Sequence, residues 1–308
     1  MALAFISHAD CARHRVATHH PETAERLAAI DDRLIASGLD AVVQHFDAPM
    51  AERAQLARVH DEDYIVAIER GAPGPGEMVC LDEGDTVMTE YSLIAARRAA
   101  GAAILGVDLV MQGRAHAAFC CVRPPGHHAE QARAMGFCIF NNVSVGAAHA
   151  LEHHGLERVA IVDFDVHHGN GTERIFAKEP RILFCSTFQH PFYPFTGHEA
   201  ETTNLVDAPL PAGTGSDAFR AAIEQHWMPA LDRFKPQLLM ISAGFDGHAE
   251  EDMAHFMLLD DDYAWITRRL VGVAQRHASG RIVSCLEGGY ALSALGRSTI
   301  AHLKALID

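Results

Sequence analysis

Val159-Ala-Ile-Val-Asp-Phe-Asp-Val-His-His-Gly-Asn170 is the stretch of sequence that decides the fold. It begins with a short, continuous apolar run, which is typical of a strand buried on both faces of a parallel sheet. It continues with polar residues and a glycine, as expected where a strand ends in a turn. Ligands of parallel α/β sheets bind beyond the carboxyl ends of the strands. The stretch therefore predicts a sheet and a site at its edge.

Similar apolar runs alternate with helical patterns along the rest of the chain. The predicted strands are Leu3–Ser7, Ala118–Val122, Val159–Phe164, Ile182–Ser186, Leu238–Ser242 and Arg281–Leu286. The predicted helices are Glu22–Ala36, Thr86–Met111, Val143–His153, Ser216–Phe234, Asp261–His277 and Leu292–Ile307. Because no linker or repeat divides this alternation, we expect one α/β domain over residues 1–308, with a mostly parallel sheet.

The composition excludes several classes of protein. The chain has 308 residues, of which 49 % are hydrophobic, and its 25 basic and 40 acidic residues give a net charge of −15. This acidity argues against a nucleic acid as the principal partner. The chain lacks an apolar run of membrane-spanning length and a leading signal-peptide pattern, and its seven cysteines form no C-x-x-C pair. We therefore expect a cytoplasmic protein with no membrane partner.

Four of the predicted strands lead into polar or glycine-rich sequences. These are Arg123-Pro-Pro-Gly-His127-His128, Asp165-Val-His167-His168, Ala243-Gly-Phe-Asp246 and Glu287-Gly-Gly-Tyr290. The carboxyl ends of parallel strands meet at one edge of a sheet, so the four segments together predict a functional site.

Asp165 and His167 are two residues apart at a strand end, so both side chains point to the same side. Asp163 shares that parity. Asp165 and His167, together with one carboxylate from another strand, would form a three-ligand Zn²⁺ site with an open position. For this third ligand we choose Asp246. Taken alone, the first pair also fits a capped turn, and Asp246 also fits the N-cap of a helix.

His127 and His128 follow a Pro-Pro-Gly turn that presents both rings at a strand end. Imidazole titrates near neutral pH, so the pair suits acid/base chemistry, with Asp163 and Asn170 as orienting acceptors. The ring paired with asparagine is expected to be the neutral base. Tyr290 follows two glycines and is positioned to donate a hydrogen bond to a developing oxyanion.

Two other histidine pairs, His19-His20 and His153-His154, are expected to be solvated and without a role. Cys138 lies close to the predicted site, but no base is assigned to activate it. It is expected to be structural.

Taken in order, the motifs resemble those of the zinc-dependent histone deacetylase superfamily. Besides the segments above, Gly136-Phe-Cys-Ile-Phe-Asn-Asn142 and His20-Pro-Glu-Thr-Ala-Glu-Arg26 match that pattern. Asn170, where class I members carry aspartate, places the chain nearer the class II branch and the bacterial deacetylase-like and acetylpolyamine amidohydrolases. The resemblance implies an arginase-like, three-layer α/β/α fold.

The same resemblance implies a role for each matching position. Zn²⁺ is held by Asp165, His167 and Asp246; the catalytic groups are His127, His128, Asp163, Asn170 and Tyr290. A structural K⁺ is bound by Asp163, Asp165, His167, Ser186 and Thr187. The substrate tunnel and its rim are formed by Asp85, Gly136, Phe137, Tyr193, Met253 and Gly288.

The activity implied is hydrolysis of an acyl-lysine amide through a water molecule activated by the metal, in a bacterial, cytoplasmic enzyme. Met253 occupies the position where polyamine-selective eukaryotic relatives carry a glutamate, and an apolar residue favours an acyl-lysine tunnel. Glu250, Glu251 and Asp252 nevertheless leave an acetylpolyamine substrate open. The sequence also leaves open whether the protein forms a homo-oligomer.

Two further alternatives are weaker. An arginase-like ureohydrolase with two Mn²⁺ ions needs an Asp-x-Asp pair, but this chain has Asp246-Gly-His248. A binding scaffold for acyl-lysine that lacks catalysis has no need of the complete set of predicted catalytic residues.

Overall fold

Eight strands form the central sheet, and every neighbouring pair of them is parallel. The computed structural model describes residues 3–16, 19–84, 86–197 and 202–308. In spatial order the strands are β2 (Gln44–Asp47), β1 (Leu3–Ser7), β5 (Ala117–Cys120), β10 (Ile282–Leu286), β9 (Leu238–Ala243), β6 (Val159–Asp163), β7 (Ile182–Gln189) and β8 (Leu205–Leu210). The predicted α/β class with a parallel sheet is confirmed.

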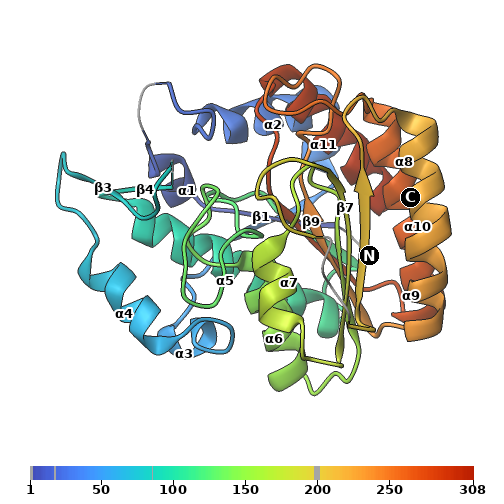
Figure 1. Cartoon of the computed structure of the whole chain (residues 1–308), viewed down its shortest axis with the longest axis horizontal. Coiled ribbons are helices and arrows are strands. Elements are labelled where there is room, and N and C mark those ends of the chain that lie inside the picture. Colours follow the sequence, from blue (N-terminus) through green and yellow to red (C-terminus); the bar gives the residue numbers. More distant parts are fainter. Residues whose placement is uncertain (1–2, 17–18, 85, 198–201) are drawn as a thin grey trace.

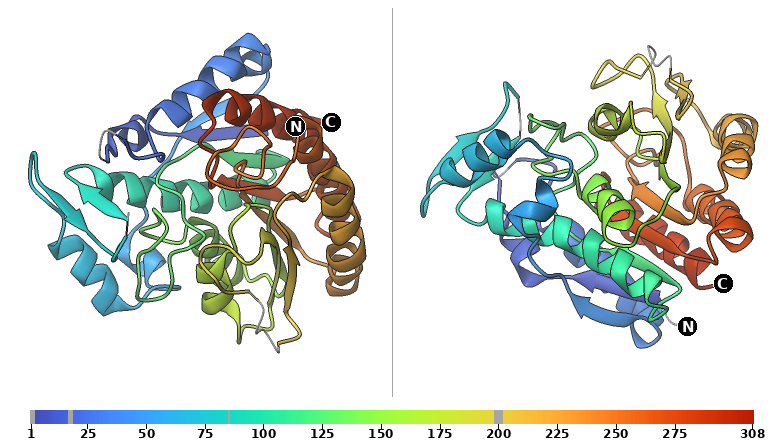
Figure 2. Two further views of the ribbon diagram at one scale, coloured as in Figure 1. Left: turned by 45° about the horizontal axis from the view of Figure 1, so that its top comes forward. Right: turned by 90° about the horizontal axis from the view of Figure 1, so that it is seen from below.

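Helices cover both faces of the sheet and give three layers (Figures 1 and 2). The long helix α5 and helix α6 pack on one face, while α10 and α11 pack on the other. The helices are α1 (Ala9–Arg13), α2 (Glu25–Ala36), η1 (Leu39–Ala41), α3 (Arg53–Leu56), α4 (Glu62–Arg70), α5 (Ser92–Met111), α6 (Asn142–Glu152), α7 (Asn170–Phe176), α8 (Ser216–Ala222), η2 (Ile223–Trp227), α9 (Met228–Phe234), α10 (Asp260–His277) and α11 (Leu292–Ile307).

All six predicted strands are present, but the two edge strands β2 and β8 were not predicted. Three of the four side chains of β2 are polar and exposed, and Phe46 is the one apolar residue, so no apolar run marks the strand. Strand β8 contains Pro209, which lacks an N–H group and is tolerated in an edge strand. The sequence signal for strands depends on burial, and it fades at the edges of the sheet.

The predicted helix Thr86–Met111 begins later, at Ser92. Its expected first turn instead forms β4 (Val87–Thr89), which pairs antiparallel with β3 (Met78–Cys80). This small ribbon lies with α4 at the left of Figure 1, away from the main sheet. Similarly, α2 begins at Glu25 rather than at Glu22, and the Glu22 carboxylate lies before the helix, buried against two arginines.

The predicted helix Ser216–Phe234 is confirmed in extent, although its middle turn, η2, is a π-helix. Among the described residues, no helix has both the length and the apolar character that a membrane crossing requires.

The central strands are buried on both faces, which explains their continuous apolar sequence. Every residue of β5, β6, β9 and β10 is buried. Helix α5 approaches this sheet closely at Gly106, where an added Cβ would lie 2.9 Å from a methyl group of Val283. The rigid layers leave the carboxyl ends of the central strands as the place for a site.

Candidate functional site

The four strands with polar carboxyl ends are neighbours in the sheet. Their spatial order is β5, β10, β9 and β6, although they come from distant parts of the chain. The sequences that follow them therefore meet at one edge, as predicted.

Asp165, His167 and Asp246 lie together and are buried. The Nδ1 atom of His167 is 3.0 Å from Oδ1 of Asp165 and 3.2 Å from Oδ2 of Asp246. Two carboxylates and one imidazole are a donor set that Zn²⁺ accepts, with coordination positions left for water and substrate. The side chains therefore fit a metal ion.

The charges of this group also fit a cation. Burial, together with the neighbouring Asp165 carboxylate, raises the pKa of Asp246 to about 6. Burial lowers the pKa of His167, but hydrogen bonds to Asp165 and Asp246 outweigh it and raise the value to about 10. Two adjacent buried carboxylates thus require positive charge between them, which a protonated imidazole or a metal ion supplies.

Two glycines allow the backbone to pass directly against these carboxylates. A Cβ added at Gly244 would lie 2.0 Å from Oδ2 of Asp165, and one added at Gly288 would lie 2.0 Å from Oδ2 of Asp246. The N–H group of Gly288 donates to Oδ2 of Asp165 at 2.8 Å. Larger residues at either position would displace the candidate ligands.

His127 and His128 lie side by side, with ring centroids 4.0 Å apart. The Nδ1 atom of His127 lies 2.9 Å from Oδ2 of Asp163, and its Nε2 atom faces Asp165 at 3.8 Å. Burial lowers the pKa of His127, but the negative charges of Asp163 and Asp165 raise it well above its ordinary value. The two carboxylates therefore favour the protonated form of this ring.

His128 has the opposite tendency. Burial and the positive charge of His127 lower its pKa well below the ordinary value. Its Nδ1 atom lies 2.8 Å from Oδ1 of Asn170, while the amide nitrogen of Asn170 donates to Glu130 at 2.8 Å. The amide oxygen must therefore face His128, so Nδ1 carries the proton and Nε2 keeps a lone pair.

Tyr290 lies in the loop between β10 and α11, beside the same pocket. The guanidinium of Arg26 lies 4.9 Å from the centre of its ring. Burial raises the pKa of Tyr290 well above its ordinary value, although Arg26 opposes the shift. The hydroxyl group therefore stays protonated and is able to donate a hydrogen bond.

A pocket of about 230 Å³ joins these groups to the surface. Five of the six residues predicted for the tunnel line it, namely Gly136, Phe137, Tyr193, Met253 and Gly288. The sixth, Asp85, lies outside the described residues. Phe137 has a φ of +68°, and a Cβ on Gly136 would lie 2.4 Å from the ring of His128, so this wall is tightly constrained.

Two of the five residues predicted to hold K⁺, Asp165 and His167, also belong to the metal group, whereas Ser186 and Thr187 lie on the neighbouring strand β7. Ser186 is paired with Asp163 across β7 and β6, and Ser186 and Thr187 are fully buried. Within the described part of the chain, the hydroxyl oxygens of Ser186 and Thr187 have no hydrogen-bond partner. A buried oxygen without a partner is costly, and a bound cation would satisfy it.

Several supporting residues were missed from the sequence. Glu287 is buried beneath the dyad and accepts hydrogen bonds from the N–H groups of Gly126 and His127, at 2.6 and 3.1 Å. Phe192 lies against His167, with ring centroids 5.4 Å apart. Both residues lie in or next to segments that the sequence analysis selected. Their roles depend on their burial in the folded protein, which the sequence of a motif does not reveal.

A buried ionic group also supports the Tyr290 loop. Glu22 pairs with Arg26 and Arg123, and Arg26 donates to the carbonyl oxygen of Gly289 at 2.6 Å. These residues come from two motifs on which the resemblance rested, but they had been assigned no function. The available signal was the presence of arginines in otherwise buried motifs, because buried charges require partners.

The acidic residues before Met253 do not all face solvent, contrary to expectation. The buried carboxylate of Glu251 accepts from the N–H groups of Tyr290 and Ala291, at 2.7 and 3.0 Å. Glu250 pairs with Arg297 at 2.6 Å. Glu251 thus holds the Tyr290 loop and is not available to an incoming cation.

Comparison with known proteins agrees with this geometry. Residues 20–306 match the family model described as the histone deacetylase domain. The chain is 38 % identical to a histone deacetylase-like amidohydrolase of Pseudomonas aeruginosa, over 88 % of this chain and 71 % of that protein. It is 34 % identical to the human polyamine deacetylase HDAC10 over 100 % of this chain, which spans about half of that protein (48 %).

The fold is also similar to a solved structure. The crystal structure of the HDA15 HD domain superposes with a TM-score of 0.92 at 31 % identity, covering 99 % of this chain and 88 % of that one.

Proposed function

Because the chain belongs to the histone deacetylase family and is a deacetylase, we propose that it hydrolyses acyl-lysine amides, releasing acetate or another short acid. The observation that carries this proposal is the pocket of about 230 Å³ lined by Phe137, Phe192 and Met253, which also contains the histidine pair. Its largely apolar wall suits the four methylene groups of a lysine side chain.

The family implies a catalytic metal, and we propose that this is one Zn²⁺ held by Asp165, His167 and Asp246. When bound, the metal polarises the amide carbonyl and lowers the pKa of an adjacent water. We further propose a structural K⁺ at Ser186 and its neighbours, which the unpartnered hydroxyl of Ser186 supports.

The protein's own groups then perform the proton transfers. Nε2 of His128 accepts the proton of the attacking water, since its neighbour Asn170 keeps Nδ1 protonated. The dyad returns a proton to the leaving amine nitrogen, while His127 keeps positive charge beside the reacting carbon. The hydroxyl of Tyr290 donates a hydrogen bond to the carbonyl oxygen as negative charge develops on it.

An acetylated polyamine is the second candidate substrate. The 34 % identity to a human polyamine deacetylase favours it, as does the net charge of −15. Against it, Glu250 and Glu251 are engaged within the protein and Met253 supplies no charge at the pocket mouth. We therefore favour acyl-lysine.

The remaining alternatives gain no support. His248, at the position where a second metal ligand would be needed for a ureohydrolase, lies 3.3 Å from Asp260 instead. A scaffold without turnover does not require a neutral base, a charged partner and a protonated tyrosine around one pocket. We also propose a cytoplasmic location, supported by seven free cysteines, six of them buried.

The test is a comparison of kcat/KM for acetyl-lysine peptide, longer acyl-lysine peptides, acetylputrescine and acetylspermidine, with Zn²⁺ present. We expect a preference of at least a hundredfold for an acyl-lysine peptide. The same preference for a polyamine would overturn the substrate assignment while keeping the enzyme. Absence of turnover on every substrate would overturn the assignment altogether.

A further inference from the structure

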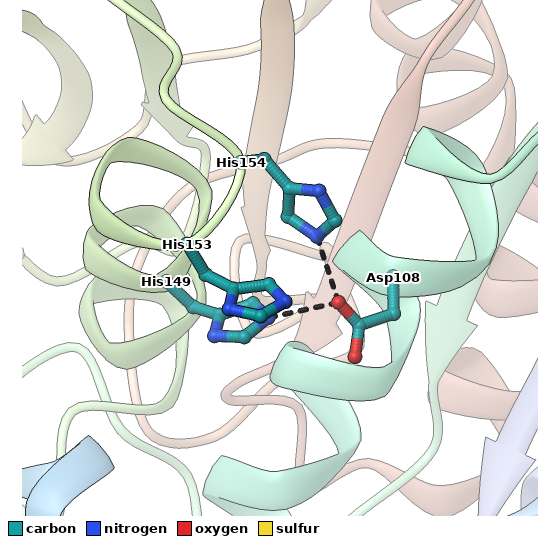
Figure 3. A group of neighbouring side chains, drawn as sticks. All are labelled: Asp108, His149, His153 and His154. Atoms are coloured by element: carbon teal, nitrogen blue, oxygen red, sulfur yellow. Dashed lines mark hydrogen bonds and ion pairs between the residues drawn. The ribbon is translucent and has the colours of Figure 1, made fainter.

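A second group of metal-competent side chains lies at the opposite end of α6 from the catalytic dyad. The N-cap of α6, Asn141, donates to the carbonyl oxygen of His127 at 3.4 Å. His149, His153 and His154 lie at the other end of this 11-residue helix, about 15 Å along its axis. Asp108, near the end of α5, faces them (Figure 3).

Two of the three rings, those of His149 and His154, bond to one carboxylate oxygen, and the ring of His153 stacks on that of His149. Nε2 of His149 is 2.8 Å from Oδ1 of Asp108, and Nε2 of His154 is 2.7 Å from the same atom. His149 and His153 are one helical turn apart and stack, with centroids 4.7 Å apart and planes 14° apart. Each of the four residues offers a ligand atom within 4.8 Å of the other three.

Hydrogen bonding accounts for only part of this arrangement. The carboxylate accepts from His149 and His154, but within the described part of the chain His153 makes no hydrogen bond to Asp108. Figure 3 nevertheless shows the ring of His153 directed to the same side as that of His149, toward Asp108. The ring of His153 stacks on that of His149, and this places a third imidazole beside the two that bond to the carboxylate.

Two of the distances are close to those between the ligands of a bound metal ion. Zn–N and Zn–O distances near 2.0 Å place tetrahedral ligand atoms about 3.3 Å apart. The pairs at 2.7 and 2.8 Å would therefore need to separate by only about half an ångström. His153 is exposed and Asp108 and His154 are partly exposed, so an ion reaches the group without opening the fold.

One neighbouring charge opposes a metal ion. The guanidinium of the exposed Arg58 lies 2.9 Å from Nδ1 of His149. Since arginine only donates, Nδ1 accepts and the proton of this ring lies on Nε2, facing Asp108. A metal on Nε2 would move that proton to Nδ1, so Arg58 must turn toward solvent when the metal binds.

We propose that Asp108, His149, His153 and His154 form a second divalent-metal site, separate from catalysis, that joins the end of α5 to the end of α6. Three imidazoles and one carboxylate suit Zn²⁺ and similar borderline ions. The site follows from a residue pair that the sequence alone classed as solvated and without a role. It does not depend on the proposed function.

The test is a calorimetric titration with Zn²⁺ of the enzyme whose catalytic site is already loaded. The wild-type protein is expected to bind one further Zn²⁺ per chain, with a Kd of about 10 µM or lower. His153→Ala/His154→Ala is expected to weaken this binding at least 30-fold, and Asp108→Asn to weaken it similarly, with deacetylase activity unchanged. The matched control, His45→Ala/His226→Ala, removes two exposed histidines elsewhere and should behave as wild type.

Arg58→Ala provides an opposite test, because it removes the charge that opposes the ion. It should tighten Zn²⁺ binding at least threefold, which loss of a merely structural contact would not do. The proposal is overturned if the wild-type protein binds no additional Zn²⁺. It is also overturned if His153→Ala/His154→Ala and the control His45→Ala/His226→Ala bind Zn²⁺ with equal affinity. Unchanged affinity in Arg58→Ala would overturn the assignment of His149 as a ligand.

Discussion

At the scale of single residues, the site depends on side chains that fix the protonation of their neighbours. Asn170 shows this most clearly, because its amide nitrogen is bound to Glu130 and its oxygen is left for His128. Asp163 gives His127 the opposite preference. The pKa values of the two adjacent histidines therefore shift in opposite directions, and the lowered value belongs to the ring paired with asparagine. Their catalytic roles stay predictions.

Glu251 acts on Tyr290 through the backbone, which gives a prediction at this scale. Its carboxylate accepts from the N–H groups of Tyr290 and Ala291. In Glu251→Gln, the amide NH2 would face a backbone N–H group. The loop that carries Tyr290, and with it the Tyr290 hydroxyl, should therefore shift. We expect kcat to fall about tenfold or more, with little change in KM.

The matched control is Glu250→Gln, next to it in sequence, whose side chain pairs with Arg297 on the surface. It should retain wild-type kcat. Equal kcat values in the two variants would contradict a positioning role for Glu251.

At the scale of elements, burial decides which features the sequence reveals. The buried central strands carry continuous apolar runs and were predicted with nearly correct bounds. The polar edge strand β2 and the ribbon β3–β4 carry no such runs and were missed. The first turn of the helix predicted from Thr86 is instead a strand of that ribbon. The periodicity of a local sequence gives no information on pairing with another segment.

Buried histidines between elements predict how stability depends on pH. His302 on α11 lies 2.6 Å from the hydroxyl of Thr267 on α10 and 2.9 Å from that of Ser284 on β10. Burial lowers the pKa of His302 to about 3. Between the unfolded value of 6.5 and this value, the unfolded chain binds a proton that the folded chain does not.

The contribution of His302 is therefore complete above pH 6.5 and declines as the pH falls toward 3. The wild-type protein should lose about 2 kcal/mol more unfolding free energy between pH 8 and pH 5 than His302→Gln does. Urea unfolding at the two pH values measures this difference. Replacement of the exposed His226 by Gln is the control and should leave the pH dependence unchanged, whereas equal pH dependence in wild type and His302→Gln would contradict the account.

At the scale of the whole molecule, one rule of parallel sheets carried the prediction of the site. Polar segments after four strands were expected to meet at one edge, and β5, β10, β9 and β6 are adjacent. The sequence also pointed to the individual residues of the metal group, the histidine dyad and most of the tunnel. It assigned no role to Glu287, Arg26 or Arg123. These buried charged residues support the site through contacts that form only in the folded protein.

Other expectations at this scale stay predictions. They are the single domain over residues 1–308, the bound K⁺ and a homo-oligomer. The group at Asp108 was not predicted, because Asp108 lies on α5, 41 residues before His149 on α6, while His153 and His154 directly follow α6.

The central claim is that the protein hydrolyses an acyl amide with His128 as the base. Its most direct test is acetate release from an acetyl-lysine peptide by the zinc-loaded protein, compared with His128→Ala, with metal content measured on both. We predict steady release by the wild-type protein, and a loss of at least 100-fold in kcat for the variant at unchanged metal content. Undiminished release by His128→Ala, or no release by the wild-type protein, would contradict the claim.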